Sequence, residues 1–169
     1  MFNKLLRENN IVAGILTVIR IYLGFAWMKA GWGKLTDGFD ASGFLAHSIE
    51  NPVVFGTEPV YGWYVSFLES FALPNAELFN ILIPLGEFLV GLGLILGCLT
   101  TAAAFFAMVM NFSFLLAGTI SHNPTDIIMA IFIAAAGANA GKFGLDRYVL
   151  PFLRKVFNKG KDNSLTISA

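Results

Sequence analysis

The residues best suited to do chemistry in this sequence lie inside long apolar stretches. Glu87 lies within the apolar run Leu78–Leu99, and Arg20 lies in the middle of an earlier run, from Ile11 to about Ala30. A carboxylate at bilayer depth costs on the order of 3 kcal/mol, so it needs a partner, a proton or a water-filled cavity. A glutamate beside an arginine can handle a proton, because the arginine stays charged while the glutamate titrates. Glu87 and Arg20 are therefore the first catalytic candidates.

The depths of these residues predict a cluster. Arg20 and Glu87 each lie about nine residues from the start of their runs, which is roughly 14 Å of helix. Because the hydrocarbon core is about 30 Å thick, both fall near its middle. Asn111, in a third apolar run, reaches a similar depth. We expect Arg20, Glu87 and Asn111 to meet inside a helix bundle, with His122 and Asp126 nearer the outer mouth.

Each candidate also has a structural interpretation. The Arg20–Glu87 pair can fix the register of a bundle, as buried ion pairs sometimes do. Asp126 suits the first turn of a helix, where the helix dipole favours a carboxylate. His122, the third catalytic candidate, can simply anchor a turn. Trp27 shares a helix face with Arg20. Trp27 and Trp32 can each stack on a ring-shaped ligand, and Trp32 equally suits anchoring at the membrane interface.

Composition limits the class of protein. The chain is 56% hydrophobic and only 13% charged, with a mean hydropathy of +0.69, which indicates a membrane protein. A net charge of zero gives no support to a nucleic-acid partner. The single cysteine, Cys98, excludes an internal disulfide and a CxxC pair. We expect no metal site, since His47 and His122 are too few for zinc or haem.

The apolar runs predict an all-α membrane protein with four transmembrane helices. The expected spans are residues 11–30, 78–98, 100–118 and 124–140, with an outward loop over 31–75. Within this loop, Trp63–Leu73 is either a short interfacial or re-entrant helix or a packed helix of a soluble loop. Lysine and arginine concentrate at both ends of the chain, so both termini should be cytoplasmic. Residues 149–169 form a basic tail, which lies on the anionic inner leaflet or is solvated.

Several short motifs resemble the DoxX/DoxD family of small prokaryotic membrane proteins. The similarity extends from about Ile11 to Arg147 and defines a domain over residues 1–148. The matching segments are Arg20-Ile21-Tyr22-Leu23-Gly24, Gly31-Trp32-Gly33-Lys34-Leu35, Gly86-Glu87, Gly91-Leu92-Gly93, Asn111, Ala136-Gly137 and Gly144-Leu145-Asp146-Arg147. The resemblance implies a multi-pass protein of the prokaryotic plasma membrane. Some relatives are subunits of thiosulfate:quinone oxidoreductase, and others are associated with oxidative, thiol or quinone stress.

The first functional hypothesis is a quinone-linked oxidoreductase subunit. Arg20 would hydrogen-bond a quinone carbonyl, and Glu87 or His122 would move a proton. Trp27, Asn111 and Asp126 would complete the quinone pocket together with Arg20. Because the sequence has no dinucleotide-binding glycine motif and no haem-attachment motif, electrons would come from a protein partner.

Two other hypotheses remain open. A small transporter needs a thicker wall than four helices provide, and therefore a homo-oligomer; the two halves show no clear inverted repeat. A non-catalytic scaffold would hold a partner at the membrane through its acidic outward loop and basic tail.

Overall fold

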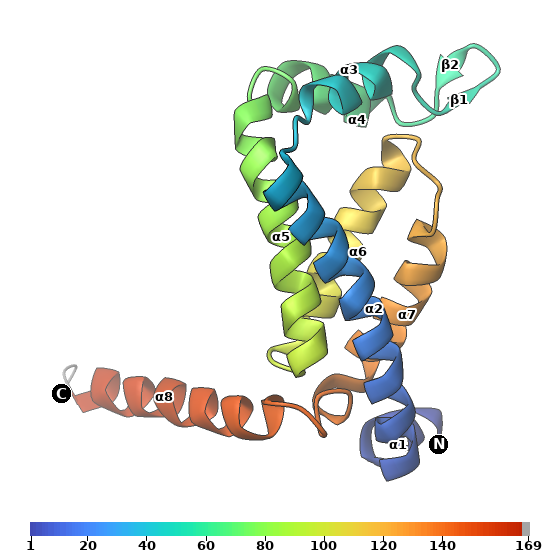
Figure 1. Cartoon of the computed structure of the whole chain (residues 1–169). Helices are drawn as coiled ribbons and strands as arrows, with labels where there is room; N and C mark the ends of the chain where they lie inside the picture. Colours follow the sequence, from blue (N-terminus) through green and yellow to red (C-terminus); the bar gives the residue numbers. More distant parts are fainter. Residues whose placement is uncertain (167–169) are drawn as a thin grey trace.

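The structure is a computed structural model that describes the backbone of residues 1–166 and the side chains of residues 1–156. Its centre is a bundle of four long helices that lie side by side (Figure 1). These helices are α2 (Asn10–Asp37), α5 (Ala76–Leu96), α6 (Thr100–Leu116) and α7 (Asn123–Ala136), the last continued by a 3-10 turn (Gly137–Asn139).

Shorter elements close the two ends of the bundle. At one end lie α1 (Phe2–Glu8) and α8 (Asp146–Thr166), and α8 projects sideways from the bundle (Figure 1). At the opposite end lie α3 (Ser42–Glu50), a hairpin of β1 (Val54–Phe55) and β2 (Glu58–Pro59), and α4 (Gly62–Phe67) with a π-helical turn (Leu68–Ala72). We call these the α1/α8 end and the α3/α4 end.

Glycines set the closest contact in the bundle, between α2 and α5. A Cβ atom on Gly24 would lie 2.8 Å from the carbonyl oxygen of Gly91, and one on Gly31 would lie 2.7 Å from that of Pro84. Larger side chains at these positions would force the backbones apart. Small residues at a helix crossing allow this approach, which is common between helices in membranes. The two glycine contacts therefore fix the register of α2 against α5.

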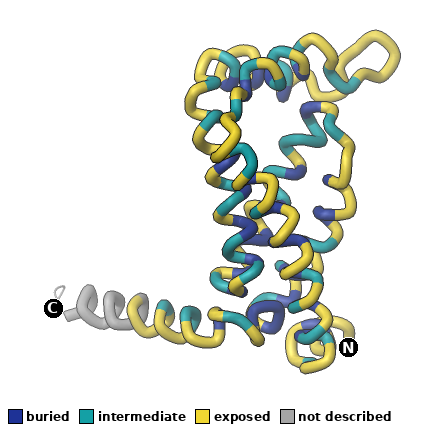
Figure 2. Tube along the Cα trace, in the orientation of Figure 1, coloured by how far each residue is buried: buried dark blue, intermediate teal, exposed yellow. Residues whose placement is uncertain are grey.

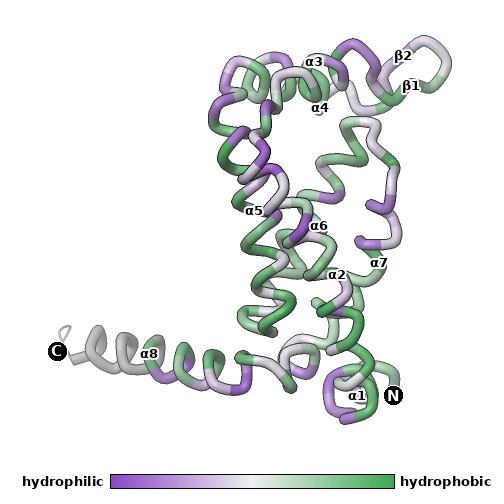
Figure 3. The backbone as a smooth tube through the Cα atoms, viewed as in Figure 1, coloured by the Kyte–Doolittle hydropathy of each residue, from purple (hydrophilic) through white to green (hydrophobic). Residues whose placement is uncertain are grey.

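The outer faces of the bundle helices are apolar. Exposed positions include Val18 and Phe25 on α2, Leu85 on α5 and Phe105 on α6. Figure 2 shows the exposed residues along the outside of each helix, and Figure 3 shows hydrophobic residues along the bundle with hydrophilic ones gathered toward its two ends. By length and apolar composition α2 and α5 can each cross a membrane, and α6 is apolar but shorter. An apolar belt of this kind suits contact with lipid.

The α3/α4 end is fastened to the bundle by side-chain hydrogen bonds. The backbone N–H of Ala41 donates to Oδ1 of Asn80 on α5 at 2.7 Å. The Tyr64 hydroxyl on α4 donates to the carbonyl oxygen of Ser113 on α6 at 3.0 Å. Apolar side chains including Ala41, Leu45 and Leu68 form a separate small core here. The helical interpretation of residues 63–73 is thus confirmed.

Some sequence-based boundaries need correction. The first span was predicted to end near residue 30, but α2 continues without a break to Asp37. Residues 31–37 therefore belong to a bundle helix instead of the outward loop. The short hairpin of β1 and β2 was not predicted, and α8 begins at Asp146, ahead of the expected tail boundary. Residues 167–169 of the predicted tail lie outside the described residues.

Candidate functional site

Polar side chains from four elements meet in a pocket of about 270 Å³ near the α3/α4 end of the bundle. We call this the polar pocket. It lies between α2, α5, α6 and the start of α7. Its polar lining comprises Lys34, Glu87, Asn111, Thr119, Ser121, His122 and Asn123; Trp27, Phe39, Phe44, Ile83 and Phe114 contribute aromatic and apolar surface, with Ala26 and Ala30.

Lys34 and Glu87 form the charged centre of the polar pocket. The Lys34 ammonium donates to both carboxylate oxygens of Glu87, at 2.8 and 2.6 Å. The Glu87 side chain is only 5% exposed, whereas that of Lys34 is 29% exposed. The Phe39 ring lies 5.7 Å from the ammonium and adds a cation–π contact. The pair brings no net charge into the pocket.

A second pair, His122 and Asp126, lies at the mouth of the pocket. Nδ1 of His122 lies 2.7 Å from Oδ2 of Asp126, one helical turn further along the chain. Asp126 lies in the first turn of α7, where the helix dipole favours its negative charge. Its side chain is buried, while the imidazole is largely exposed. The imidazole is therefore in contact with solvent, while a buried carboxylate holds the ring.

Asn111 and Trp27 present polar atoms that lack partners. Among the side chains of residues 1–156, Nδ2 and Oδ1 of Asn111 and Nε1 of Trp27 are buried without a hydrogen bond. Both residues line the polar pocket. An unpaired buried polar group costs about 1–3 kcal/mol. Asn111 and Trp27 thus offer two donors and one acceptor to whatever occupies the pocket.

Arg20 lies elsewhere, and the predicted cluster of Arg20, Glu87 and Asn111 is wrong. The Arg20 guanidinium donates to the carbonyl oxygens of Leu94 and Ile95 at 2.6 and 2.8 Å, and to that of Ala140 at 3.1 Å. It is fully buried near the α1/α8 end. The register of α2 against α5 places Arg20 opposite Gly97, where a Cβ atom would meet the guanidinium. Arg20 therefore joins the ends of helices and does not reach the polar pocket.

Asp146 completes this helix junction. Its carboxylate accepts hydrogen bonds from the backbone N–H groups of Leu99 and Thr100, at 2.6 and 3.0 Å, at the start of α6. Asp146 thereby caps α6, which begins immediately after the sharp turn at Gly97. The junction of Arg20 and Asp146 holds α2, α5, α6 and the chain before α8 together.

The polar pocket brings together most of the residues singled out in the sequence. Its lining includes Trp27, Glu87, Asn111 and His122. Asp126 does not line the pocket but contacts His122 through a hydrogen bond. The missing residue was Lys34, which had been assigned to the outward loop. Its spacing could have identified it, because Trp27, Gly31 and Lys34 follow one another at intervals of four and three on the same helix face.

Comparison with known proteins gives one match. The family model for DoxX matches residues 15–119, which include most of α2 and all of α5 and α6. Neither the curated proteins nor the solved structures contain a match to the chain. Trp27, Lys34, Glu87 and Asn111 lie inside the matched segment, and His122 and Asp126 lie just beyond it. Since the match covers more than half of the sequence and agrees with the apolar helical bundle, the chain belongs to the DoxX family of membrane proteins.

Proposed function

We propose that this protein is a quinone-linked oxidoreductase subunit of a prokaryotic plasma membrane, and that the polar pocket binds the quinone ring. The observation that carries the proposal is the set of unpaired polar atoms on Asn111 and Trp27, both buried in the pocket wall. A ring with carbonyl oxygens matches them, because the Asn111 amide and the Trp27 indole both donate. The carboxamide oxygen of Asn111 can accept from a hydroxyl once the ring is reduced.

The charges of the pocket also favour a neutral ligand. The Lys34 ammonium is already neutralised by the Glu87 carboxylate, at 2.8 and 2.6 Å. A phosphate or sulfate group would have to compete with Glu87 for Lys34, the only lysine or arginine among residues 1–156 that lines the pocket. The aromatic rings of Trp27 and Phe114 supply surface for a flat ring. A neutral, carbonyl-bearing ring therefore fits this lining better than an anion.

The two charged pairs have distinct tasks in this proposal. A bound quinone supplies the redox chemistry, because it accepts electrons together with protons. His122, exposed at the mouth and held by Asp126, takes protons from solvent and passes them inward. The Lys34–Glu87 pair carries a proton on the inner side, since its carboxylate can be protonated while the lysine holds its position. Electrons arrive from a protein partner that carries its own redox cofactor.

The proposal includes a membrane topology of four spans with both termini in the cytoplasm. The helices α2, α5, α6 and α7 lie side by side, and their outer faces are apolar (Figures 1 and 3). Helix α6 rises about 25 Å, which is close to the thickness of the hydrocarbon core. Arginine and lysine are concentrated at the α1/α8 end, where Arg154 and Lys155 of α8 are exposed. Helix α8 then lies on the anionic inner leaflet.

Quinone retention tests the proposed pocket. The protein is purified in mild detergent from its native membranes, and the extracted quinone is quantified by mass spectrometry. We expect near-stoichiometric quinone with the wild type and at least a tenfold loss with Asn111→Leu. Because the amide of Asn111 is buried without a partner, the leucine should leave thermal stability equal or higher. A stable variant that has lost its quinone shows that the amide serves a ligand.

The matched control is Asn75→Leu, an asparagine at the exposed start of α5 that does not line the polar pocket. This variant should retain quinone like the wild type. Equal quinone content in all three proteins would contradict the assigned pocket. Absence of quinone from all three would contradict the quinone-linked function and return the transporter and scaffold hypotheses to first place.

A further inference from the structure

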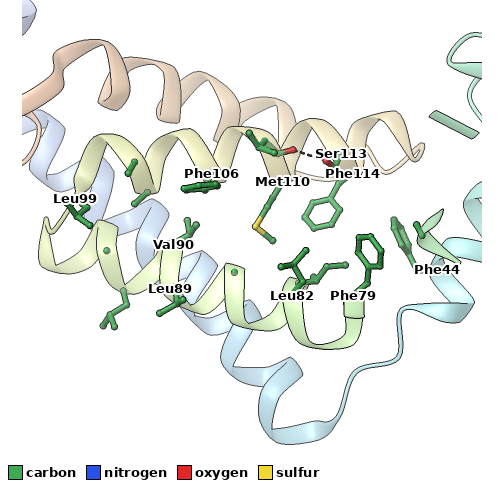
Figure 4. Close-up of a pocket in the computed structure, with 18 of the residues that line it drawn as sticks. Phe44, Phe79, Leu82, Leu89, Val90, Leu99, Phe106, Met110, Ser113 and Phe114 are labelled. Carbon is green, nitrogen blue, oxygen red and sulfur yellow. Dashed lines mark hydrogen bonds between the residues drawn. The ribbon is translucent and has the colours of Figure 1, made fainter. Parts of the chain in front are cut away.

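A second and larger cavity lies between α5 and α6, as Figure 4 shows. Its volume is about 770 Å³, and we call it the apolar cavity. Nearly all of its lining is hydrocarbon, with Leu89, Val90 and Phe106 in its middle part. Cys98 and Leu99 close it toward the α1/α8 end, and side chains of α3 and α4 close it at the other end.

The apolar cavity has the shape of a long groove. It follows α6 from Leu99 to Phe114, which is about 22 Å of helix. On the α5 side, Gly86 and Gly93 keep it hollow, since a Cβ atom on Gly86 would lie 3.3 Å from the Met110 sulfur. Leu89 and Phe106 are about half exposed, so the groove opens sideways between the two helices. In a bilayer this opening faces the lipid chains.

The apolar cavity and the polar pocket share one wall. Phe44, Ile83 and Phe114 line both spaces. The rings of Phe44 and Phe114 meet edge to face with their centroids 6.4 Å apart, and both point toward the cavity in Figure 4. These three residues lie between the two spaces, and we infer that rotation of the Phe44 or Phe114 ring joins them. A molecule with a polar ring and an apolar chain could then occupy both.

We propose that the apolar cavity holds the isoprenoid chain of the quinone whose ring lies in the polar pocket, with the chain passing beside Phe44 and Phe114. This inference rests on the proposed function and names the substrate class as long-chain, membrane-resident quinones. A phospholipid is a poorer occupant, because its phosphate would need a cation and Lys34 is already paired with Glu87. The groove runs along about 22 Å of helix and contains almost no polar surface.

The groove contributes more to selectivity for tailed quinones than to the free energy of quinone binding. An isoprenoid chain leaves other hydrocarbon chains when it enters, so the hydrophobic effect contributes little. Packing against both helices remains, and the chain holds the ring at the entrance of the polar pocket. Obstruction of the groove should therefore weaken binding of a tailed quinone and leave the tailless ring unaffected.

Trp27 provides a direct readout of ring binding, because quinones quench indole fluorescence and Trp27 lines the polar pocket. The chain has three tryptophans, and the other two, Trp32 and Trp63, are exposed at 58% and 67%. Trp32→Phe with Trp63→Phe leaves Trp27 as the sole tryptophan. This protein is titrated, at fixed detergent, with dimethoxy-methyl-benzoquinone and with the same ring carrying a geranylgeranyl chain.

The test compares two paired substitutions in this background. The groove pair, Ala102→Phe with Val109→Phe, fills the apolar cavity from α6. The control pair, Ala135→Phe with Val18→Phe, adds the same groups at exposed positions that line neither space. The readout is the ratio of the affinity for the tailed quinone to that for the tailless ring. We expect this ratio to fall about tenfold or more in the groove pair and to stay unchanged in the control pair.

The outcomes separate this inference from the proposed function. An unchanged ratio in the groove pair, with both probes still quenching Trp27, would overturn the chain site and leave the quinone ring site intact. Absence of saturable quenching by either probe in the parent protein would overturn both. Using a ratio corrects for any general weakening of the polar pocket by the groove substitutions, because such weakening affects both probes.

Discussion

At the residue scale, the polar pocket depends on how Glu87 is held. The Glu87 carboxylate is almost completely buried, so its charge needs a partner inside the protein. Lys34 supplies it from the outer part of α2, and its flexible stem leaves the ammonium partly in contact with water. The two partners are therefore unequal. Loss of the lysine isolates a buried charge, whereas loss of the glutamate leaves a charge that can reach solvent.

This asymmetry predicts an order of stabilities. Lys34→Met should lower the free energy of unfolding by about 3 kcal/mol, because it leaves a buried carboxylate unpaired. Glu87→Gln should cost less, about 1 kcal/mol, since the lysine can turn to water. The double variant Lys34→Met with Glu87→Leu should recover most of the loss. Denaturant unfolding in detergent, followed by circular dichroism, measures all three.

Function and stability should separate in the double variant. If the pair carries the proton, this stable protein still loses quinone-dependent turnover. A double variant that keeps full turnover would reduce the pair to a structural contact. Equal costs for the two single substitutions would contradict the unequal burial of the partners.

Arg20 shows how far the sequence alone could lead. Its burial and its helix face were predictable, because Arg20, Gly24, Trp27 and Gly31 follow one another at helical spacing and all are buried. Its partner was not predictable in this way. Depth counted from the starts of the two apolar runs placed Arg20 beside Glu87, but such a count does not contain the register of α2 against α5. An arginine can donate hydrogen bonds to backbone carbonyl oxygens or to a carboxylate. Residue spacing alone does not show which of these acceptors it uses.

At the element scale, the contact between α2 and α5 explains this outcome. Gly31 lies against Pro84 and Phe88, and Gly24 lies against Gly91. Once these contacts are made, Arg20 falls near the end of α5. Gly93 and Gly97 are four residues apart, which is the spacing of a common helix-packing motif, yet Gly93 faces α6 and Gly97 makes room for Arg20. Which glycine meets which neighbour depends on the three-dimensional register, and the sequence pattern does not contain it.

The hydrogen bond that fastens the α3/α4 end to the bundle leads to a prediction about pH. Tyr64 of α4 donates to the carbonyl oxygen of Ser113 on α6 at 3.0 Å. Burial raises the pKa of the Tyr64 phenol above its usual value. The folded state thus favours the neutral phenol. Its contribution to stability is fully present below the unfolded pKa of about 10 and is lost as the pH rises through the higher folded pKa.

We expect an alkaline loss of stability that depends on Tyr64. In the wild type, the free energy of unfolding should fall as the pH rises above about 10. Tyr64→Phe should cost about 1 kcal/mol at neutral pH and should lose this alkaline step. Tyr22→Phe, at a tyrosine that is 68% exposed, is the matched control and should keep the step. The same step in Tyr64→Phe would show that another group causes it.

At the scale of the whole molecule, charge is distributed unevenly between the two ends of the bundle. Residues 35–141 contain no lysine or arginine, whereas α1 and the start of α8 carry several. The segment 38–75, which forms the α3/α4 end, contains Asp40, Glu50, Glu58 and Glu69. Basic residues stay on the cytoplasmic side of a membrane. This asymmetry is the reason for the proposed orientation, in which the α1/α8 end lies inside the cell and the polar pocket lies near the outer surface.

Cysteine labelling tests this orientation. In a Cys98→Ala background, Thr57→Cys introduces a thiol in the exposed hairpin, and Asn3→Cys introduces one in exposed α1. A membrane-impermeant maleimide on intact cells should label Thr57→Cys and should reach Asn3→Cys only after permeabilisation. The opposite pattern would reverse the topology, and equal labelling of both in intact cells would exclude a membrane-crossing α2. Because His122 lies near the same end as the hairpin, the result also decides from which side protons, and the electron-donating partner, reach the polar pocket.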